Sequence, residues 1–159
     1  MDLKNIDNLP YRNNVSLVIF QNNNFLIIQK VGWPDNWWKF PQGGVEDGET
    51  EEMAVHREFL EELGNENFKV IAKSSFINKY DWSTDSIKKA GYKWRGQTQR
   101  FFLLEYLGND KEIVIDKNEI LQYKWVDLKD LFNEIDNNSK DFVNYKDSVK
   151  KALLEFKLF

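Results

Sequence analysis

Residues 43–65 read GGVEDGETEEMAVHREFLEELGN, and this stretch predicts a helix with an unusual charge. Thr50 is a favourable N-cap residue and Gly64 a favourable residue to end a helix, so we expect a helix between them. The stretch contains eight carboxylates and one basic side chain, Arg57. The carboxylates of this stretch repel one another, so another interaction must offset their repulsion.

The position of each glutamate separates those that the helix tolerates from those that it does not. Glu51 and Glu52 lie in the first turn, where the positive end of the helix dipole favours acids. Glu58, Glu61 and Glu62 are spaced by three and four residues, so they share one face near the end where the dipole disfavours them. Like charges at this spacing repel by about 0.2–0.5 kcal/mol per pair. A solvated acidic face is the plain explanation, and a shared cation is the alternative.

The loop before this helix favours the cation. Gly43, Gly44 and Gly48 allow tight backbone geometry, so a carbonyl oxygen could approach an ion that the three later glutamates share. Hard oxygen ligands that leave coordination positions open suit Mg²⁺ or Mn²⁺, with water and phosphate oxygens as the remaining ligands. The chain has no cysteine, so a thiolate site is excluded.

The spacing of the polar residues resembles the signature of the Nudix hydrolases. It runs from Gly43 through Glu49 to Arg57-Glu58-Phe59, then Glu61-Glu62 and Gly64. The resemblance implies an α+β fold, an α/β/α sandwich with a mixed sheet. It also implies hydrolysis of a nucleoside diphosphate linked to another group, with divalent cations.

The resemblance also implies roles for the residues of this stretch. Glu61 and Glu62 are expected as metal ligands, with the carbonyl of Gly43 as a further one. Glu58 is expected as general base or ligand, and Arg57 as the residue that orients a carboxylate. Cations would neutralise the charge of a phosphoanhydride and lower the pKa of a bound water, whose proton a carboxylate then removes. The expected catalytic residues are Arg57, Glu58 and Glu61.

Four further stretches resemble the branch that contains bacterial RNA pyrophosphohydrolases and dinucleoside polyphosphate hydrolases. In that branch a glutamate before a Trp-containing strand completes the metal site, and in NEILQYKWV the matching residue is Glu119. Without the resemblance, such a glutamate would be taken for a surface residue. The four stretches are LPYRNNV (9–15), WWKFPQGG (37–44), RGQTQRFFLLEY (95–106) and VNYKDSV (143–149).

Substrate recognition needs cations for phosphates and a flat surface for a base. Arg12, Lys30 and Lys39 are candidates for the phosphates, and Tyr145 with Lys146 for base stacking and charge. Lys30 is a point charge where an arginine could also stack on a base. The plain alternatives are that the lysines are solvated and that Tyr145 packs its helix.

Composition and pattern indicate a globular chain of mixed structure. We expect a single domain over residues 1–159, because 42% hydrophobic residues suffice for a core, and a cytoplasmic location without membrane contact. Residues 43–65 carry a net charge of −7 while the whole chain carries −4, which suits a cation beside an anionic substrate. The expected strands are 15–20 and 25–30 as a hairpin, 68–74, 76–82, 97–107 and 123–126, and the expected further helices are 128–135 and 143–156.

Two classes of function follow. The first is an enzyme that removes pyrophosphate from the 5′ end of triphosphorylated RNA, with hydrolysis of diadenosine tetraphosphate or other dinucleoside polyphosphates as the alternative. The second is a noncatalytic module that senses nucleotides. The repulsive trio of Glu58, Glu61 and Glu62 favours the enzyme, because a sensor has less need of it. No DNA partner is expected, and protein partners stay open.

Overall fold

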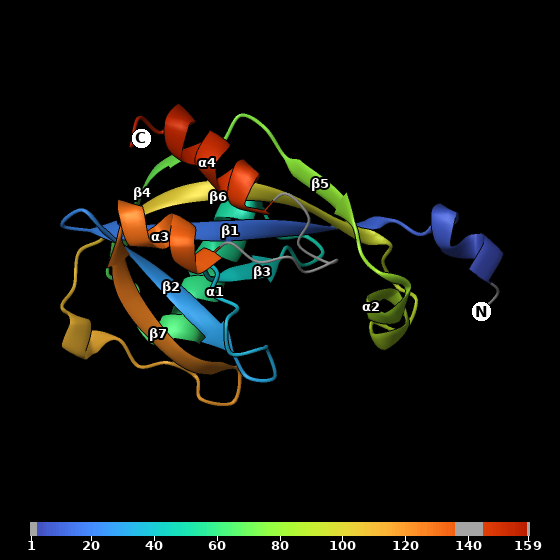
Figure 1. The fold of residues 1–159 in the computed structure, drawn as a ribbon, viewed down its shortest axis with the longest axis horizontal. Coiled ribbons are helices and arrows are strands. Elements are labelled where there is room, and N and C mark those ends of the chain that lie inside the picture. The colour runs from blue at the N-terminus through green and yellow to red at the C-terminus, as the bar shows by residue number, and fades with distance from the viewer. Residues whose placement is uncertain (1–2, 136–144, 159) are drawn as a thin grey trace.

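The computed structural model describes residues 3–135 and 145–158. Figure 1 shows a twisted sheet with the helices on its two faces and α2 apart from them. The strands are β1 (Tyr11–Gln21), β2 (Asn24–Lys30), β3 (Gln42–Gly44), β4 (Phe68–Lys73), β5 (Asn78–Asp81), β6 (Gly96–Tyr106) and β7 (Ile120–Asp127). The helices are α1 (Glu51–Leu63), α2 (Thr84–Lys89), α3 (Leu128–Ile135) and α4 (Tyr145–Glu155), with short 3-10 turns η1 (Leu3–Asn8) and η2 (Asp110–Glu112).

The strands of the described residues form one mixed sheet. Its main order is β4-β6-β1-β2-β7, while β3 pairs with β1 and β5 pairs with β6. β1 runs parallel to β6, and the other pairs are antiparallel. β1 is buried on both faces, because four of its residues 15–19 are apolar and the fifth is the small Ser16. This strand is therefore the central strand of the sheet.

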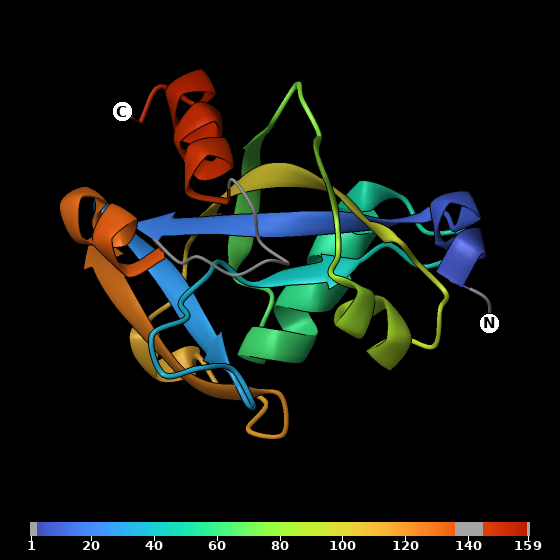
Figure 2. The same cartoon turned by 45° about the vertical axis from the view of Figure 1, so that its right-hand side comes forward.

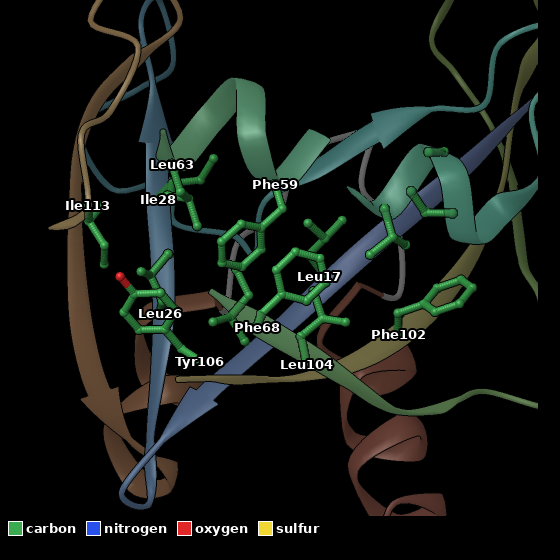
Figure 3. Packing of buried hydrophobic residues seen from close by; sticks show 14 of the residues in the cluster. Leu17, Leu26, Ile28, Phe59, Leu63, Phe68, Phe102, Leu104, Tyr106 and Ile113 are labelled. Atoms are coloured by element: carbon green, nitrogen blue, oxygen red, sulfur yellow. The ribbon is translucent and has the colours of Figure 1, made fainter. Parts of the chain in front are cut away.

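Helices cover both faces of the sheet, as an α/β/α sandwich requires. α1 packs Val55, Phe59 and Leu63 against one face, where Phe59 stacks on Phe68 with ring centroids 4.1 Å apart (Figure 3). On the opposite face lie α3 and α4 (orange and red in Figure 2), whose buried residues form a second cluster with Val18. The expected α+β fold with a mixed sheet is confirmed.

The ends of α1 follow the predicted caps. The Thr50 side chain accepts a hydrogen bond from the Met53 N–H, and Gly64 adopts a left-handed φ of 77°. The hairpin between β1 and β2 turns at Asn22 and Asn23, both with positive φ, which matches the twist of the flanking strands. No helix of the described residues is long and apolar enough to cross a membrane.

Other boundaries differ from the sequence prediction. The predicted strand 76–82 contracts to β5, and α2 and β3 were not predicted. α2 has only six residues and one buried side chain, Ile87, so it leaves no helical periodicity to detect. The predicted helix 143–156 is described from Tyr145 to Glu155, and residues 143 and 144 lie outside the described residues. The single domain over 1–159 stays a prediction.

Candidate metal and substrate site

A cleft of about 530 Å³ opens where the α1 face meets the ends of several strands. Acidic, basic and aromatic side chains all line it. Seven of the residues expected at the site line it: Arg12, Lys30, Gly43, Glu58, Glu61, Glu62 and Glu119.

Pairing in the sheet brings these residues together from distant parts of the chain. β3 pairs antiparallel with β1, with Gly43 opposite Val15, so the glycine loop lies beside the strand that carries Arg12. The Val31 N–H donates to the Glu119 carbonyl at 2.9 Å, which places the loop before β7 next to the end of β2. Lys30 and Glu119 thus meet at one end of the cleft.

Arg57 offsets the repulsion between the carboxylates of this stretch. Its Nε and Nη2 donate to the Glu49 carboxylate at 2.8 and 2.9 Å, and Nη2 also donates to the Gly44 carbonyl at 2.8 Å. Its Nη1 donates to Glu58 at 2.8 Å and lies 3.3 Å from Glu61. The hydrogen bonds from Arg57 lower the pKa of Glu49 to about 2. The Arg57 guanidinium therefore orients three carboxylates and the glycine loop. Arg57 itself does not line the cleft.

Gly43 is the residue that leaves room for Glu58. A Cβ at this position would lie 2.0 Å from the Glu58 Cδ, so any other residue would displace that carboxylate. Burial raises the pKa of Glu58, and the hydrogen bond from Arg57 opposes this rise. The carboxylate is therefore held against the loop with a proton affinity above that of an ordinary glutamate.

Glu62 is the most unusual group of the cleft. Its side chain is 1% exposed, and neither carboxylate oxygen has a hydrogen-bond partner. The nearest cation is the Lys30 Nζ at 3.5 Å, an ion-pair distance rather than a short hydrogen bond. Burial raises the pKa of Glu62 to about 8. Because a buried carboxylate without a hydrogen-bond partner is costly, this group fits a bound cation.

The oxygen ligands suit a hard divalent ion, but their side chains do not converge on one coordination site. Among residues 3–135 and 145–158 no three acidic or histidine side chains converge on one point. Two of the carboxylates, Glu58 and Glu61, are turned towards Arg57. All the candidate ligands are oxygens, and the glutamates line one cleft with Gly43, so the chemistry of the site suits Mg²⁺ or Mn²⁺.

Three residues expected to bind substrate do not line the cleft. Lys39 is fully buried, with Nζ 4.0 Å from the centroid of the Tyr145 ring. Tyr145 is 3% exposed, and its hydroxyl accepts a hydrogen bond from the Phe40 N–H at 3.1 Å. Lys146 is half-buried in the first turn of α4. In this structure Tyr145 and Lys39 pack the α4 face of the sheet, which is the plain alternative for Tyr145.

This packing predicts a stability effect at Tyr145. Replacing Tyr145 with alanine should lower the free energy of unfolding by about 3–5 kcal/mol, the usual cost of removing a buried aromatic ring. Urea unfolding measures this, and Tyr145→Phe, which keeps the ring but loses the hydroxyl that accepts from the Phe40 N–H, should cost about 1 kcal/mol. A large rise of the Michaelis constant without loss of stability would instead make Tyr145 a substrate residue.

The cleft also contains residues that the sequence did not reveal. They come from β1, β3 and β6, from the loop after β2 and from the segment around α2. The signals were an aromatic-rich loop, WPDNWW, and a cap residue, Ser83, before a short helix. The additional lining residues are Asn14, Trp33, Gln42, Trp82, Ser86, Lys89, Ala90 and Gln97.

Comparison with known proteins places this arrangement in a family. A model of the NUDIX domain matches residues 10–146. This chain belongs to the Nudix family. The Nudix chain is 38% identical over 130 residues to an RNA pyrophosphohydrolase of Gluconobacter oxydans, covering 79% of this chain and 76% of the relative. It is 38% identical over 136 residues to an RNA pyrophosphohydrolase of Rickettsia conorii, covering 83% and 84%.

A solved Nudix-like structure agrees in fold. The dihydroneopterin triphosphate pyrophosphohydrolase of E. coli superposes with a TM-score of 0.68 at 21% identity, covering 92% of this chain and 99% of that one. The expected family and the reaction class of a Nudix pyrophosphohydrolase are thereby confirmed by the family match and the relatives. Nudix proteins typically depend on divalent metals.

Proposed function

We propose that this Nudix protein removes pyrophosphate from the 5′ end of triphosphorylated RNA in a reaction that needs Mg²⁺ or Mn²⁺. The observation that carries the proposal is one cleft in which four glutamates lie beside Arg12 and Lys30. Acidic ligands and basic side chains together suit a cation with a polyphosphate. The names of the two relatives support RNA as the substrate.

The metal would be held by carboxylate oxygens and one backbone oxygen of the cleft. When bound, the ion would neutralise charge on the phosphates and lower the pKa of a water molecule. Glu62 is the first candidate ligand, because its buried oxygens have no hydrogen-bond partner. The complete proposed set is the Gly43 carbonyl, Glu58, Glu61, Glu62 and Glu119.

Glu58 is the proposed general base, although it remains a candidate ligand. Burial raises its pKa, so its carboxylate takes up a proton more readily than an exposed glutamate, and Arg57 fixes its direction. Water attacks phosphorus as the base takes its proton, and the bond to the leaving pyrophosphate breaks. RNA with a 5′ monophosphate remains. Glu61, which shares Arg57, would support the same proton transfer.

Arg12 and Lys30 are the proposed phosphate-binding residues. The Arg12 guanidinium lies against Gly44, where an added Cβ would be 2.4 Å from Nε, so the glycine lets this side chain lie over the loop. Lys30 also lines the cleft, with its Nζ 3.5 Å from a Glu62 carboxylate oxygen. Both would neutralise a polyphosphate that approaches the glutamates. Lys39 and Lys146 are not part of this proposal.

A direct comparison of substrates tests the function. Triphosphate-ended RNA and diadenosine tetraphosphate are offered separately with Mg²⁺, and kcat/KM is measured for each by product analysis. We expect a higher kcat/KM for the RNA, with pyrophosphate and 5′-monophosphate RNA as products. A higher kcat/KM for the dinucleotide would favour that alternative, and turnover of neither would favour the nucleotide sensor. The cytoplasmic location and the absence of a DNA partner stay predictions.

A further inference from the structure

The segment between β5 and β6 forms an ordered wall of the cleft. The Trp82 N–H donates to the Arg95 carbonyl at 2.9 Å and closes the base of the segment. The Ser83 side chain caps α2 by accepting from the Ser86 N–H, and Ile87 is buried. Three independent contacts therefore hold α2 in place beside the cleft.

One face of α2 is turned to the cleft. Ser86, Lys89 and Ala90 line it, and their spacing of three and four residues puts them on the same side of the helix. Ser86 and Ala90 are small, so they leave space along this wall. Lys89 places a charge there, and its neighbour Lys88 does not line the cleft.

Two indole rings also line the cleft. Trp82 lines it at the end of β5, and Trp33 lines it from the loop after β2. The backbone N–H of Trp33 donates to the Lys30 carbonyl at 3.1 Å. The Trp33 ring contacts the Trp37 ring edge-on, with ring centroids 6.2 Å apart. Both rings are half-buried, so each is packed on one part and open on another. Such surfaces suit nucleic acid bases, which stack on aromatic side chains whatever their sequence.

We infer that Trp82, with Trp33 as a second surface, forms the stacking subsite for the RNA base nearest the triphosphate, and that Lys89 binds the RNA backbone along α2. This inference rests on the proposed function. Tyr145, the aromatic expected for this role, is buried in the α4 core, so the base must stack elsewhere. Trp82 and Trp33 share one cleft with the glutamates and with Arg12, so the base and the triphosphate of one nucleotide reach their partners together.

Kinetics of Trp82 variants test the subsite. Trp82→Ala should raise the Michaelis constant for triphosphate-ended RNA about tenfold, given the usual strength of stacking on an aromatic ring. The turnover number should change little, because stacking holds substrate and transition state alike. Trp82→Phe should keep most of the affinity, and Trp82→Leu, which keeps apolar bulk without a flat ring, should behave as Trp82→Ala. Trp94→Ala is the matched control, because this indole of the same segment does not line the cleft.

Abasic substrates separate stacking from indirect effects. RNA that lacks the first base should bind wild type and Trp82→Ala equally, whereas intact RNA distinguishes them. For Lys89→Gln the salt dependence of log KM should flatten by about 0.7, the effect of losing one single-strand phosphate contact, while Lys88→Gln leaves it unchanged.

The outcomes keep this inference distinct from the proposed function. If wild type releases pyrophosphate from RNA and folded Trp82→Ala and Trp82→Leu both retain its Michaelis constant, the stacking subsite is wrong and the function stands. An equal loss on abasic and intact RNA would also overturn stacking. If wild type releases no pyrophosphate from RNA, both the function and the subsite are wrong.

Discussion

Replacing Glu62 with glutamine is expected to lower turnover by more than roughly 100-fold, because losing residues that only support a metal ligand already costs about 10- to 100-fold. The same change should not lower the stability of the metal-free protein. Glu62 buries a carboxylate whose oxygens have no hydrogen-bond partner, so a neutral amide removes a cost. Turnover should therefore fall while the stability of the metal-free protein does not.

The raised pKa of Glu62 also predicts how the stability of the metal-free protein changes with pH. Burial raises the pKa of Glu62 from 4.5 to about 8, so between these values the folded state keeps a proton that the unfolded state has lost. Stability of the metal-free wild type should fall as pH rises through this range, and Glu62→Gln should lack this part of the fall. Urea unfolding at several pH values measures the difference.

Metal titration and a control variant complete the test. Saturating Mg²⁺ or Mn²⁺ should raise the melting temperature of wild type more than that of Glu62→Gln, because a ligand of the folded state stabilises it. Glu52→Gln is the control, because Glu52 lies on the same helix but pairs with exposed Lys73 outside the cleft. Wild-type activity in the Glu62 variant would remove Glu62 from the metal site.

Replacing Gly43 with alanine is expected to lower turnover about 100-fold in a folded protein. The added Cβ would lie 2.0 Å from the Glu58 Cδ, and the flexible end of this side chain has to move. A displacement of about 1 Å in a catalytic group costs about 100-fold. The three atoms nearest to the added Cβ all belong to the Glu58 side chain and none to the backbone, so the free energy of unfolding should change little.

The neighbouring glycine provides a comparison. A Cβ at Gly44 would lie 2.4 Å from Arg12 atoms instead of Glu58, so Gly44→Ala should mainly raise the Michaelis constant for the triphosphate end. Steady-state kinetics at saturating metal and circular dichroism of both variants make the comparison. If Gly43→Ala retains the wild-type turnover number, the position of Glu58 does not matter for the reaction.

The sequence predicted the part of the molecule whose causes are local. The caps at Thr50 and Gly64 lie next to the turns that they end, so they set the bounds of α1 without help from the rest of the chain. The shared face of Glu58 and Glu62 follows from helix geometry alone. The pairing of Arg57 with carboxylates also follows, since Arg57 is the only basic residue of its stretch.

The parts that the sequence missed depend on distant contacts. Lys39 and Tyr145 lie 106 positions apart in the chain, and only the packing of α4 on the sheet brings their side chains together. From residue type alone, Lys39 was expected to bind phosphates and Tyr145 to stack on a base. α2 carries one buried residue, and its role as a wall depends on where β5 and β6 place Trp82. Burial and tertiary position are not encoded in residue type at these positions.

We propose that the divalent ion and the triphosphate meet in the glutamate cleft. The most direct measurement is anomalous scattering from Mn²⁺ in crystals of the wild-type protein. We predict a Mn²⁺ peak beside the Glu62 carboxylate within the cleft, and loss of that peak in Glu62→Gln. Ordered Mn²⁺ only outside the cleft, in a protein whose turnover requires the ion, would contradict the claim.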